Sequence, residues 1–195
     1  MGCMPFPTKV KKLEDPKTLR ALAHPLRLRL LGLLRTGGPA TVSTLAAAVH
    51  QAVPLVSYHL RQLAEHGFIE EAPDLAKDRR ETWWRSSHEF TSWSMTDFLD
   101  TPERLDALGL LQHEILGAHV GRIKAFFDAA QTWDKEWLDA AEMSDLRLTL
   151  TPAELKQLVA ELWEVINRWR DREPSPDAGV AELILYGIPR EPGPR

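Results

Sequence analysis

The chain has 195 residues, of which 44% are hydrophobic and 27% charged, values typical of a globular protein and not of a disordered one. No apolar run approaches the roughly 18 residues that a membrane helix needs. Residues 1–12 also lack the apolar core of a signal peptide, so we expect a flexible N-terminus and a cytoplasmic protein that makes no membrane contact. Cys3 is the single cysteine, which excludes an intrachain disulfide or a thiolate metal cluster within one chain.

The charge is distributed unevenly along the chain. Residues 1–90 hold 13 Lys or Arg against 9 Asp or Glu, whereas residues 91–195 hold 11 against 19. A basic half favours a polyanionic partner, and an acidic half favours self-association or a small effector. Chance segregation of charge is the alternative interpretation.

Three short helices are expected near the N-terminus. Asp15 and Pro16 form an N-cap followed by a first helical residue, which predicts that a helix begins there. A second helix begins at Pro25 and ends at the glycine pair 37–38, and a third, small helix covers residues 41–49.

A fourth helix is predicted over residues 53–66. Val56, Leu60 and Leu63 recur at i, i+4 and i+7, which indicates one buried stripe and turns the remaining positions outward. His59, two residues after a serine, is interpreted as an anchor that packs this helix against a neighbour. Gly67 then ends the helix.

Two strand-like runs follow this helix, residues 68–72 and residues 80–86, joined by a polar loop that is too long for a tight turn. Four helices followed by a hairpin form a winged helix-turn-helix, which we place over residues 13–90. In this fold one helix enters a DNA major groove.

The motifs resemble those of the arsenical-resistance (ArsR-like) family of winged-helix repressors. The resemblance is carried by Leu45-Ala46 with Val49, by the runs 56–63 (VSYHLRQL) and 67–70 (GFIE), and by the upstream run 24–27 (HPLR). It covers roughly residues 15–86 and implies a homodimeric repressor. His50 and Ala52 depart from the family pattern, which has Gly in the turn and Ser as the N-cap of the recognition helix.

The expected DNA contacts come from two places. The 53–66 helix reads the major groove, and the basic 73–80 wing follows the backbone or enters the minor groove. For the wing, a solvated hairpin tip is the alternative. The predicted DNA-binding residues are Pro54, Ser57, Tyr58, Arg61, Lys77, Arg79 and Arg80.

No cofactor or metal is predicted. A thiolate site of the type found in the family is absent, since the third helix carries no cysteine. His113 and His119 are six residues apart and point to different faces of a helix. His113-Glu114 also begins like a zinc-protease motif, but Gly117 stands where the second histidine belongs.

The acidic half, residues 91–195, is predicted to provide dimerisation and effector sensing. A helix of about 30 residues begins at Thr101-Pro102, and its apolar stripe is expected to pack on a second copy of the chain. The predicted dimerisation residues are Leu108, Leu111, Ile115, Ile123 and Phe126.

A small helix-plus-strand unit is expected at the C-terminus. Its helix covers residues 152–172 behind a capping box at Thr151, and residues 146–150 and 181–186 are predicted strands. Tryptophans at the junction of the two halves favour a pocket for a small organic effector, with core packing as the alternative. The predicted pocket residues are Trp93, Trp133 and Trp137.

The sequence therefore predicts a mainly α-helical, DNA-binding transcriptional regulator. We expect a homodimeric repressor that binds double-stranded DNA and is released by an unidentified non-metal effector. The alternative is a winged-helix module that binds protein without sequence-specific DNA binding. An enzyme is not expected, because no nucleophile, base and orienting group share a recognisable spacing.

Overall fold

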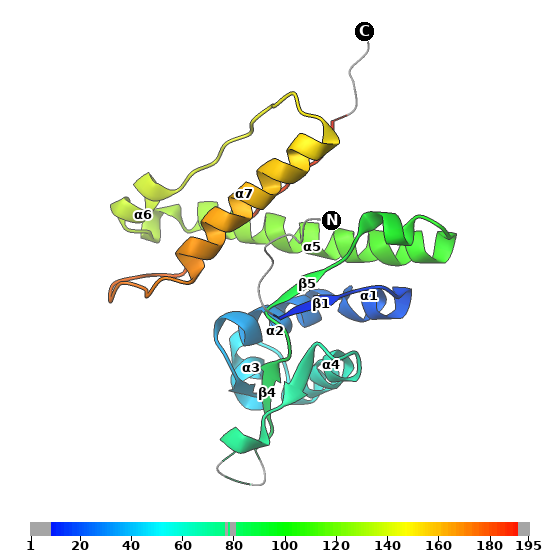
Figure 1. The fold of residues 1–195 in the computed structure, drawn as a ribbon. Coiled ribbons are helices and arrows are strands. Elements are labelled where there is room, and N and C mark those ends of the chain that lie inside the picture. Colours follow the sequence, from blue (N-terminus) through cyan, green and yellow to red (C-terminus); the bar gives the residue numbers. More distant parts are fainter. Residues whose placement is uncertain (1–8, 77, 79–80, 191–195) are drawn as a thin grey trace. The chain divides into compact units, whose positions relative to one another are not determined.

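The computed structural model describes residues 9–76, 78 and 81–190, and the described chain divides after Asp128 into two compact units. The first unit contains four short helices, five short strands and a long helix (Figure 1). Its elements are β1 (Val10–Lys12), α1 (Pro16–Leu22), α2 (Pro25–Thr36), β2 (Ala40–Thr41), α3 (Val42–Val49), α4 (Val53–Glu65), β3 (Ile69–Glu71), the 3-10 turn η1 (Pro73–Leu75), β4 (Trp83–Ser86), β5 (Phe90–Ser92), the 3-10 turn η2 (Met95–Phe98) and α5 (Pro102–Asp128).

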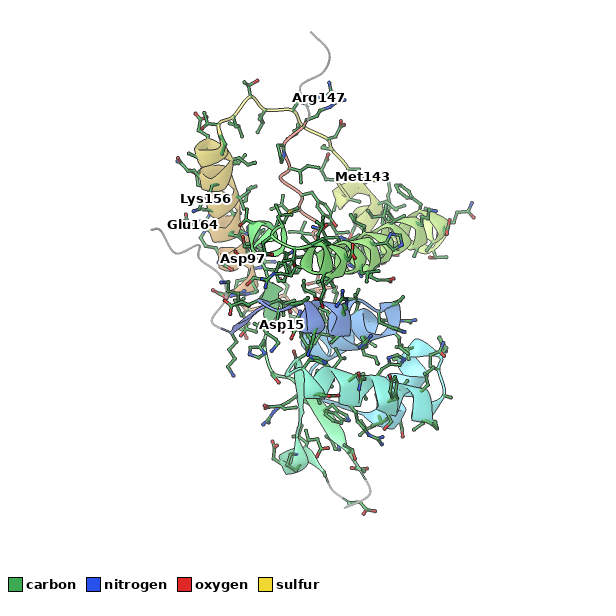
Figure 2. All side chains as sticks on the ribbon, turned by 90° about the vertical axis from the view of Figure 1, so that its right-hand side faces the viewer. Asp15, Asp97, Met143, Arg147, Lys156 and Glu164 are labelled. Atoms are coloured by element: carbon green, nitrogen blue, oxygen red, sulfur yellow. The ribbon has the colours of Figure 1, made fainter. Side chains whose placement is uncertain are left out.

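The first two helices begin with the caps that their sequences predict. Asp15, labelled in Figure 2, lies at the start of α1. Its carboxylate accepts hydrogen bonds from the N–H groups of Lys17, at 2.8 Å, and Thr18, at 3.2 Å, and so caps the helix. His24 caps α2, because its Nδ1 accepts a hydrogen bond of 3.1 Å from the N–H of Leu26. Each cap satisfies donors that a helix start leaves unpaired.

The turn between α3 and α4 tolerates the two departures from the family pattern. His50 adopts the left-handed conformation, with φ 54° and ψ 46°, and ends α3 as a glycine would. Ala52 provides no side-chain cap for α4, but Pro54 lies in the first turn and has no N–H to satisfy. Gly67, with φ 67°, ends α4 in the left-handed conformation as predicted.

The wing is a three-stranded antiparallel sheet in the order β2-β4-β3. Glu71 pairs with Trp84 and Ile69 with Ser86, so the predicted hairpin is present, with strands shorter than expected. The additional strand β2 precedes α3 and pairs with the first half of β4. The sheet thereby connects the entry of the helix-turn-helix to its wing.

The N-terminal segment corrects one expectation, because residues 10–12 are not a flexible end. They form β1, which runs parallel to β5 and pairs Val10 with Phe90 and Lys12 with Ser92. Leu13 follows directly and is buried in the core, which fixes the strand in register. Three paired residues and one buried leucine are too short a pattern for sequence periodicity to reveal.

Helix α5 completes the core of this unit. It packs against α1, and Leu108 and Leu111 are fully buried together with Leu19 and Leu22 of α1. This placement corrects the prediction that Leu108 and Leu111 lie on a dimer interface, since they serve their own chain's core. The compact unit therefore continues past residue 90, where the sequence pattern placed the end of the domain.

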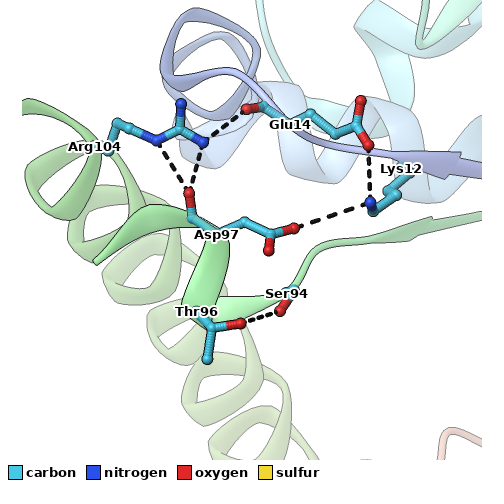
Figure 3. Close-up of polar contacts among 6 residues, drawn as sticks. All are labelled: Lys12, Glu14, Ser94, Thr96, Asp97 and Arg104. Atoms are coloured by element: carbon cyan, nitrogen blue, oxygen red, sulfur yellow. Dashed lines mark hydrogen bonds and ion pairs between the residues drawn. The ribbon is translucent and has the colours of Figure 1, made fainter. Parts of the chain in front are cut away.

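Polar contacts link β1 to the start of α5 (Figure 3). The Arg104 guanidinium donates to the carbonyl oxygen of Asp97, at 2.6 and 3.0 Å, and to that of Glu14, at 3.1 Å. The same guanidinium lies over the Phe98 ring, 5.0 Å from its centroid. Lys12 Nζ lies 2.8 Å from the Glu14 carboxylate and 3.9 Å from that of Asp97. One arginine thus joins the start of α5 to the neighbouring turn η2 and to the segment after β1, which is 90 positions away in the sequence.

The C-terminal unit contains the 3-10 turn η3 (Ala130–Thr132), α6 (Lys135–Ala140) and α7 (Pro152–Arg170). The predicted capping box is present, with the Thr151 hydroxyl accepting from the N–H of Glu154 at 3.2 Å. Lys156 and Glu164 lie along α7 (Figure 2). None of the helices in the described part of the chain is long and apolar enough to cross a membrane.

The strands expected at residues 146–150 and 181–186 are not formed. Leu146 is 83% exposed and Leu183 is 78% exposed, so their alternating side chains have no apolar layer to cover. An apolar alternation without a core to face does not stabilise a strand. Of the expected helix-plus-strand unit, the helix is present.

Candidate nucleic-acid interface

Helix α4 has one buried face and one exposed face. Val56, Leu60 and Leu63 are fully buried, as the sequence spacing predicts. Tyr58 is 55% exposed, and Arg61 is exposed one turn further along the helix.

The exposed face carries groups that bind nucleic acid. Pro54 is exposed near the start of α4, and Ser57 is half-buried. A hydroxyl, a phenol and a guanidinium are donors or acceptors suited to base edges and phosphates. We call this face, formed by Pro54, Ser57, Tyr58 and Arg61, the recognition surface.

Helix α2 contributes a basic residue, Arg27, beside the recognition surface. Burial lowers the pKa of Arg27, while the Tyr58 phenol acts in the opposite direction, so the two side chains are close enough to interact. Arg27 Nε has no hydrogen-bond partner among the described residues. Arg27 is not among the predicted DNA-binding residues, although it lies within the run 24–27 on which the family resemblance partly rests.

His59 packs α4 against α2, which confirms its interpretation as an anchor. It is 6% exposed, and its ring lies 4.4 Å from that of His24 between centroids. Burial, then the positive charges of His24 and Arg27, lower the pKa of His59. Burial and Arg27 likewise lower the pKa of His24, against the opposing effect of Glu114.

The cap at the start of α2 also requires a neutral His24. Its Nδ1 is the acceptor of the Leu26 N–H and would lose that role when protonated. The positive end of the helix dipole further disfavours a cation at this position. Both imidazoles are therefore neutral near pH 7.

The basic wing residues Lys77, Arg79 and Arg80 lie outside the described residues, and their contact with DNA stays a prediction. At the base of the wing, Arg85 Nε donates to the Glu70 carboxylate at 2.7 Å, and its Nη1 lies 3.4 Å from that of Asp74. These partners raise the pKa of Arg85 and neutralise its charge. The charge of Arg85 is therefore balanced by carboxylates at the base of the wing.

Helix α5 has a second apolar stripe besides the one in the core. Ile115 packs against the core, and Phe126 contacts the ring of Phe127 at 5.7 Å between centroids. Ile123, by contrast, is one of five exposed apolar residues on one side of the helix, where intervals of eleven, four, three and four positions separate them. These exposed apolar residues are Leu105, Leu116, Val120, Ile123 and Phe127, and we call them the α5 stripe.

The predicted effector-pocket tryptophans belong to different compact units. Trp93 packs against the core of the first unit. Trp133 and Trp137 flank or lie on α6 of the second unit and are about two-fifths exposed. Their common pocket stays a prediction. In the described part of the chain, no three His, Cys, Asp or Glu side chains gather as a metal site.

Part of the first unit is similar to a known type of domain. Residues 22–72, from the end of α1 to the start of the wing loop, match the family model of a helix-turn-helix domain. None of the curated proteins matches the chain. The match coincides with the run of motifs described above and confirms the predicted helix-turn-helix domain.

Several solved structures are similar to part of the chain. A homodimeric winged helix-turn-helix DNA-binding domain of a possible ArsR-family regulator from Mycobacterium bovis is 21% identical, with 53% of this chain and 76% of that chain covered and a TM-score of 0.33. A possible transcriptional regulator for arsenical resistance is 28% identical, with 65% and 98% covered and a TM-score of 0.32. A transcriptional regulator from Thermotoga maritima is 17% identical, with 82% and 88% covered and a TM-score of 0.32.

Proposed function

We propose that this chain, a winged helix-turn-helix regulator of ArsR-like type, binds double-stranded DNA as a homodimer and represses transcription. The observation that carries the proposal is the division of α4 into a buried stripe and the recognition surface. A helix held in this way can enter a major groove without losing its packing. The basic charge of residues 1–90 favours approach to a polyanion.

The dimer is proposed to form through the α5 stripe. Val120 is 50% exposed and lies near the middle of the distal half of α5, where the side chains no longer reach the core of their own unit. An exposed apolar stripe on a long helix can be buried against the same stripe of a second copy, as in symmetric dimers. Two recognition helices would then face successive major grooves.

Release of the DNA is proposed to follow binding of a small organic effector by the acidic half of the chain. Trp133 and Trp137 supply exposed aromatic surface in the C-terminal unit, which suits an apolar ligand. The supporting observations are this aromatic surface and the excess of acidic residues after residue 90.

DNA binding is tested by fluorescence anisotropy with a duplex from the protein's own promoter and a shuffled duplex of the same composition. We expect a preference for the promoter and an affinity that falls steeply with salt. Arg61→Ala should weaken binding by about 1–3 kcal/mol, or about five- to 150-fold, if Arg61 contacts a base edge.

Lys17→Ala is the matched control, because it removes one positive charge from an exposed position on α1. Equal affinity for both duplexes would refute sequence-specific DNA binding and favour a protein-binding module. If Arg61→Ala weakened binding no more than Lys17→Ala, Arg61 would not be part of the recognition surface.

A further inference from the structure

A polar cleft lies at the base of the wing and includes none of the residues of the recognition surface. It has a volume of about 280 Å³ and lies between the C-terminal end of α2 and the turn that joins β4 to β5. Its polar walls are formed by Lys9, Arg35, Arg85, Ser86, Ser87, His88 and Glu89. Neither the recognition surface nor the α5 stripe includes any of these residues.

The Arg35 guanidinium in this cleft has only neutral partners. Its Nε donates to the carbonyl oxygen of His88 at 3.1 Å, and its Nη2 donates to the Thr91 hydroxyl at 2.7 Å. Burial lowers the pKa of Arg35 to about 10, and no carboxylate of the described residues offsets that effect. A largely buried cation is ordinarily paired with an anion, because its desolvation is costly.

The surroundings of His88 show that the cleft is electropositive. Burial lowers the pKa of His88, and the charges of Lys11, Arg35 and Lys9 lower it further, with Glu70 alone acting in the opposite direction. Nδ1 of His88 is buried and has no hydrogen-bond partner among the described residues. The imidazole is thus a neutral group held among cations.

The acidic residues near the cleft do not cancel this charge. The Glu70 carboxylate already forms an ion pair with Arg85 at 2.7 Å, and the two opposite charges balance each other. Glu89 also lines the cleft, but it is exposed, and the partners of Arg35 are the His88 carbonyl oxygen and the Thr91 hydroxyl. Lys9, which is exposed, and Arg35 are two cations that line the same cleft, and the charges of both lower the pKa of His88.

We propose that this cleft binds a small oxyanion, a phosphate or a phosphoryl group, between Arg35 and Lys9. The Ser87 hydroxyl and the His88 imidazole supply neutral donors beside the two charges. A volume of about 280 Å³ is at the small end of ligand sites, so it suits a phosphate with a small organic group and not a whole nucleotide.

The position of the cleft favours a free anion over a DNA backbone phosphate. Ser86 pairs with Ile69 at one end of the β3–β4 hairpin, whereas the wing tip joins the other end, after Glu71 and before Trp83. Figure 1 shows β4 running from the tip toward β5. A bound oxyanion would link α2 to the base of the wing, so it would stabilise the wing where it meets the helices.

The site is tested with inorganic phosphate and the full chain. Thermal unfolding and titration calorimetry are compared in sodium phosphate and in sodium chloride at matched ionic strength. We expect a saturable rise in the unfolding temperature that phosphate produces and chloride does not. Lys9→Gln should weaken phosphate binding by about tenfold or more, since it removes one charge-assisted contact.

One control and one further variant complete the test. Lys17→Gln removes the same charge from α1 and should leave phosphate binding unchanged. Arg35→Gln should abolish phosphate binding, but Arg35 also donates a hydrogen bond to the His88 carbonyl oxygen, so this variant could fail to fold. In that case the Lys9→Gln variant, at an exposed position, decides whether the cleft binds phosphate. Equal stabilisation by phosphate and chloride, or an unchanged phosphate affinity in Lys9→Gln, would overturn the proposal.

A DNA titration identifies the source of the oxyanion. If Lys9→Gln binds phosphate weakly and promoter DNA normally, the site takes a free anion, as we expect. If it weakens both by a similar factor, the oxyanion is a backbone phosphate, and the assignment to a free ligand is wrong. Phosphate binding does not depend on DNA recognition, so the site and the proposed function fail separately.

Discussion

Replacing His50 by glycine should stabilise the protein. His50 has φ 54° and ψ 46° at the C-terminal end of α3, a conformation that costs an L-residue about 1–2 kcal/mol. Glycine adopts it freely, but it loses about 0.5–1 kcal/mol more conformational entropy on folding. The imidazole is exposed, and among the described residues no hydrogen bond of its ring would be lost with it. The difference predicts a net gain of about 0.5–1 kcal/mol for His50→Gly.

The assay is urea unfolding followed by circular dichroism, which gives the free energy of unfolding. His50→Ala is the first control, since alanine keeps the Cβ and therefore the cost of the left-handed conformation. Ala48→Gly is the second, because it places the same glycine inside α3, at an exposed position, where it should cost about 1 kcal/mol.

The pattern across the three variants decides the question. Stabilisation by His50→Gly alone supports backbone strain at this residue. If His50→Ala stabilised the protein as much, the imidazole itself would be unfavourable and the conformational reasoning would be wrong. A loss of stability in His50→Gly would mean that the side chain contributes more than the strain costs.

Three further predictions concern packing, pH and capping. Leu60→Ala should lower the free energy of unfolding by about 2–5 kcal/mol, because it leaves a cavity beneath α4. Urea unfolding measures this loss of stability. The pKa values of His24 and His59 are lowered from 6.5 in the folded state, so the unfolded chain binds more protons below about pH 6.5. Stability should therefore fall from pH 7 toward pH 5, and a wild-type pH dependence in a His59→Gln variant would contradict this assignment. Thr151→Ala should destabilise α7 by about 1 kcal/mol, seen as faster hydrogen exchange in its first turns, whereas the exposed Thr101→Ala should leave α7 unchanged.

The helices and their ends were predictable because their signals are local. A cap such as Asp15 and a stop such as Gly67 act within one helical turn, and the stripe of α4 is set by three leucine or valine positions. The strands β1 and β5 were not predictable, since three residues give no periodicity and their pairing joins positions 80 residues apart. Parallel pairing of this kind is fixed by the tertiary structure.

The role of α5 was only partly predictable for a different reason. Its apolar residues were interpreted as one stripe for a partner chain, whereas the structure uses two sides of the helix. Leu108 and Leu111 pack in the core, and Val120 and Phe127 remain exposed. Periodicity shows which side of a helix is apolar, but it does not show whether the covering surface belongs to the same chain.

The packing of α1 against α5 defines the smallest fragment that can carry the recognition surface. A fragment that ends after β5, at Ser92, keeps every helix and strand of the winged motif but loses Ala107, Leu108 and Leu111. Leu19 and Leu22 would then face water, at a cost of about 1.5–3 kcal/mol for each leucine that becomes fully exposed. The folding unit therefore includes α5 and ends with it at Asp128, so the helix that closes the core of the DNA-binding unit also presents the α5 stripe.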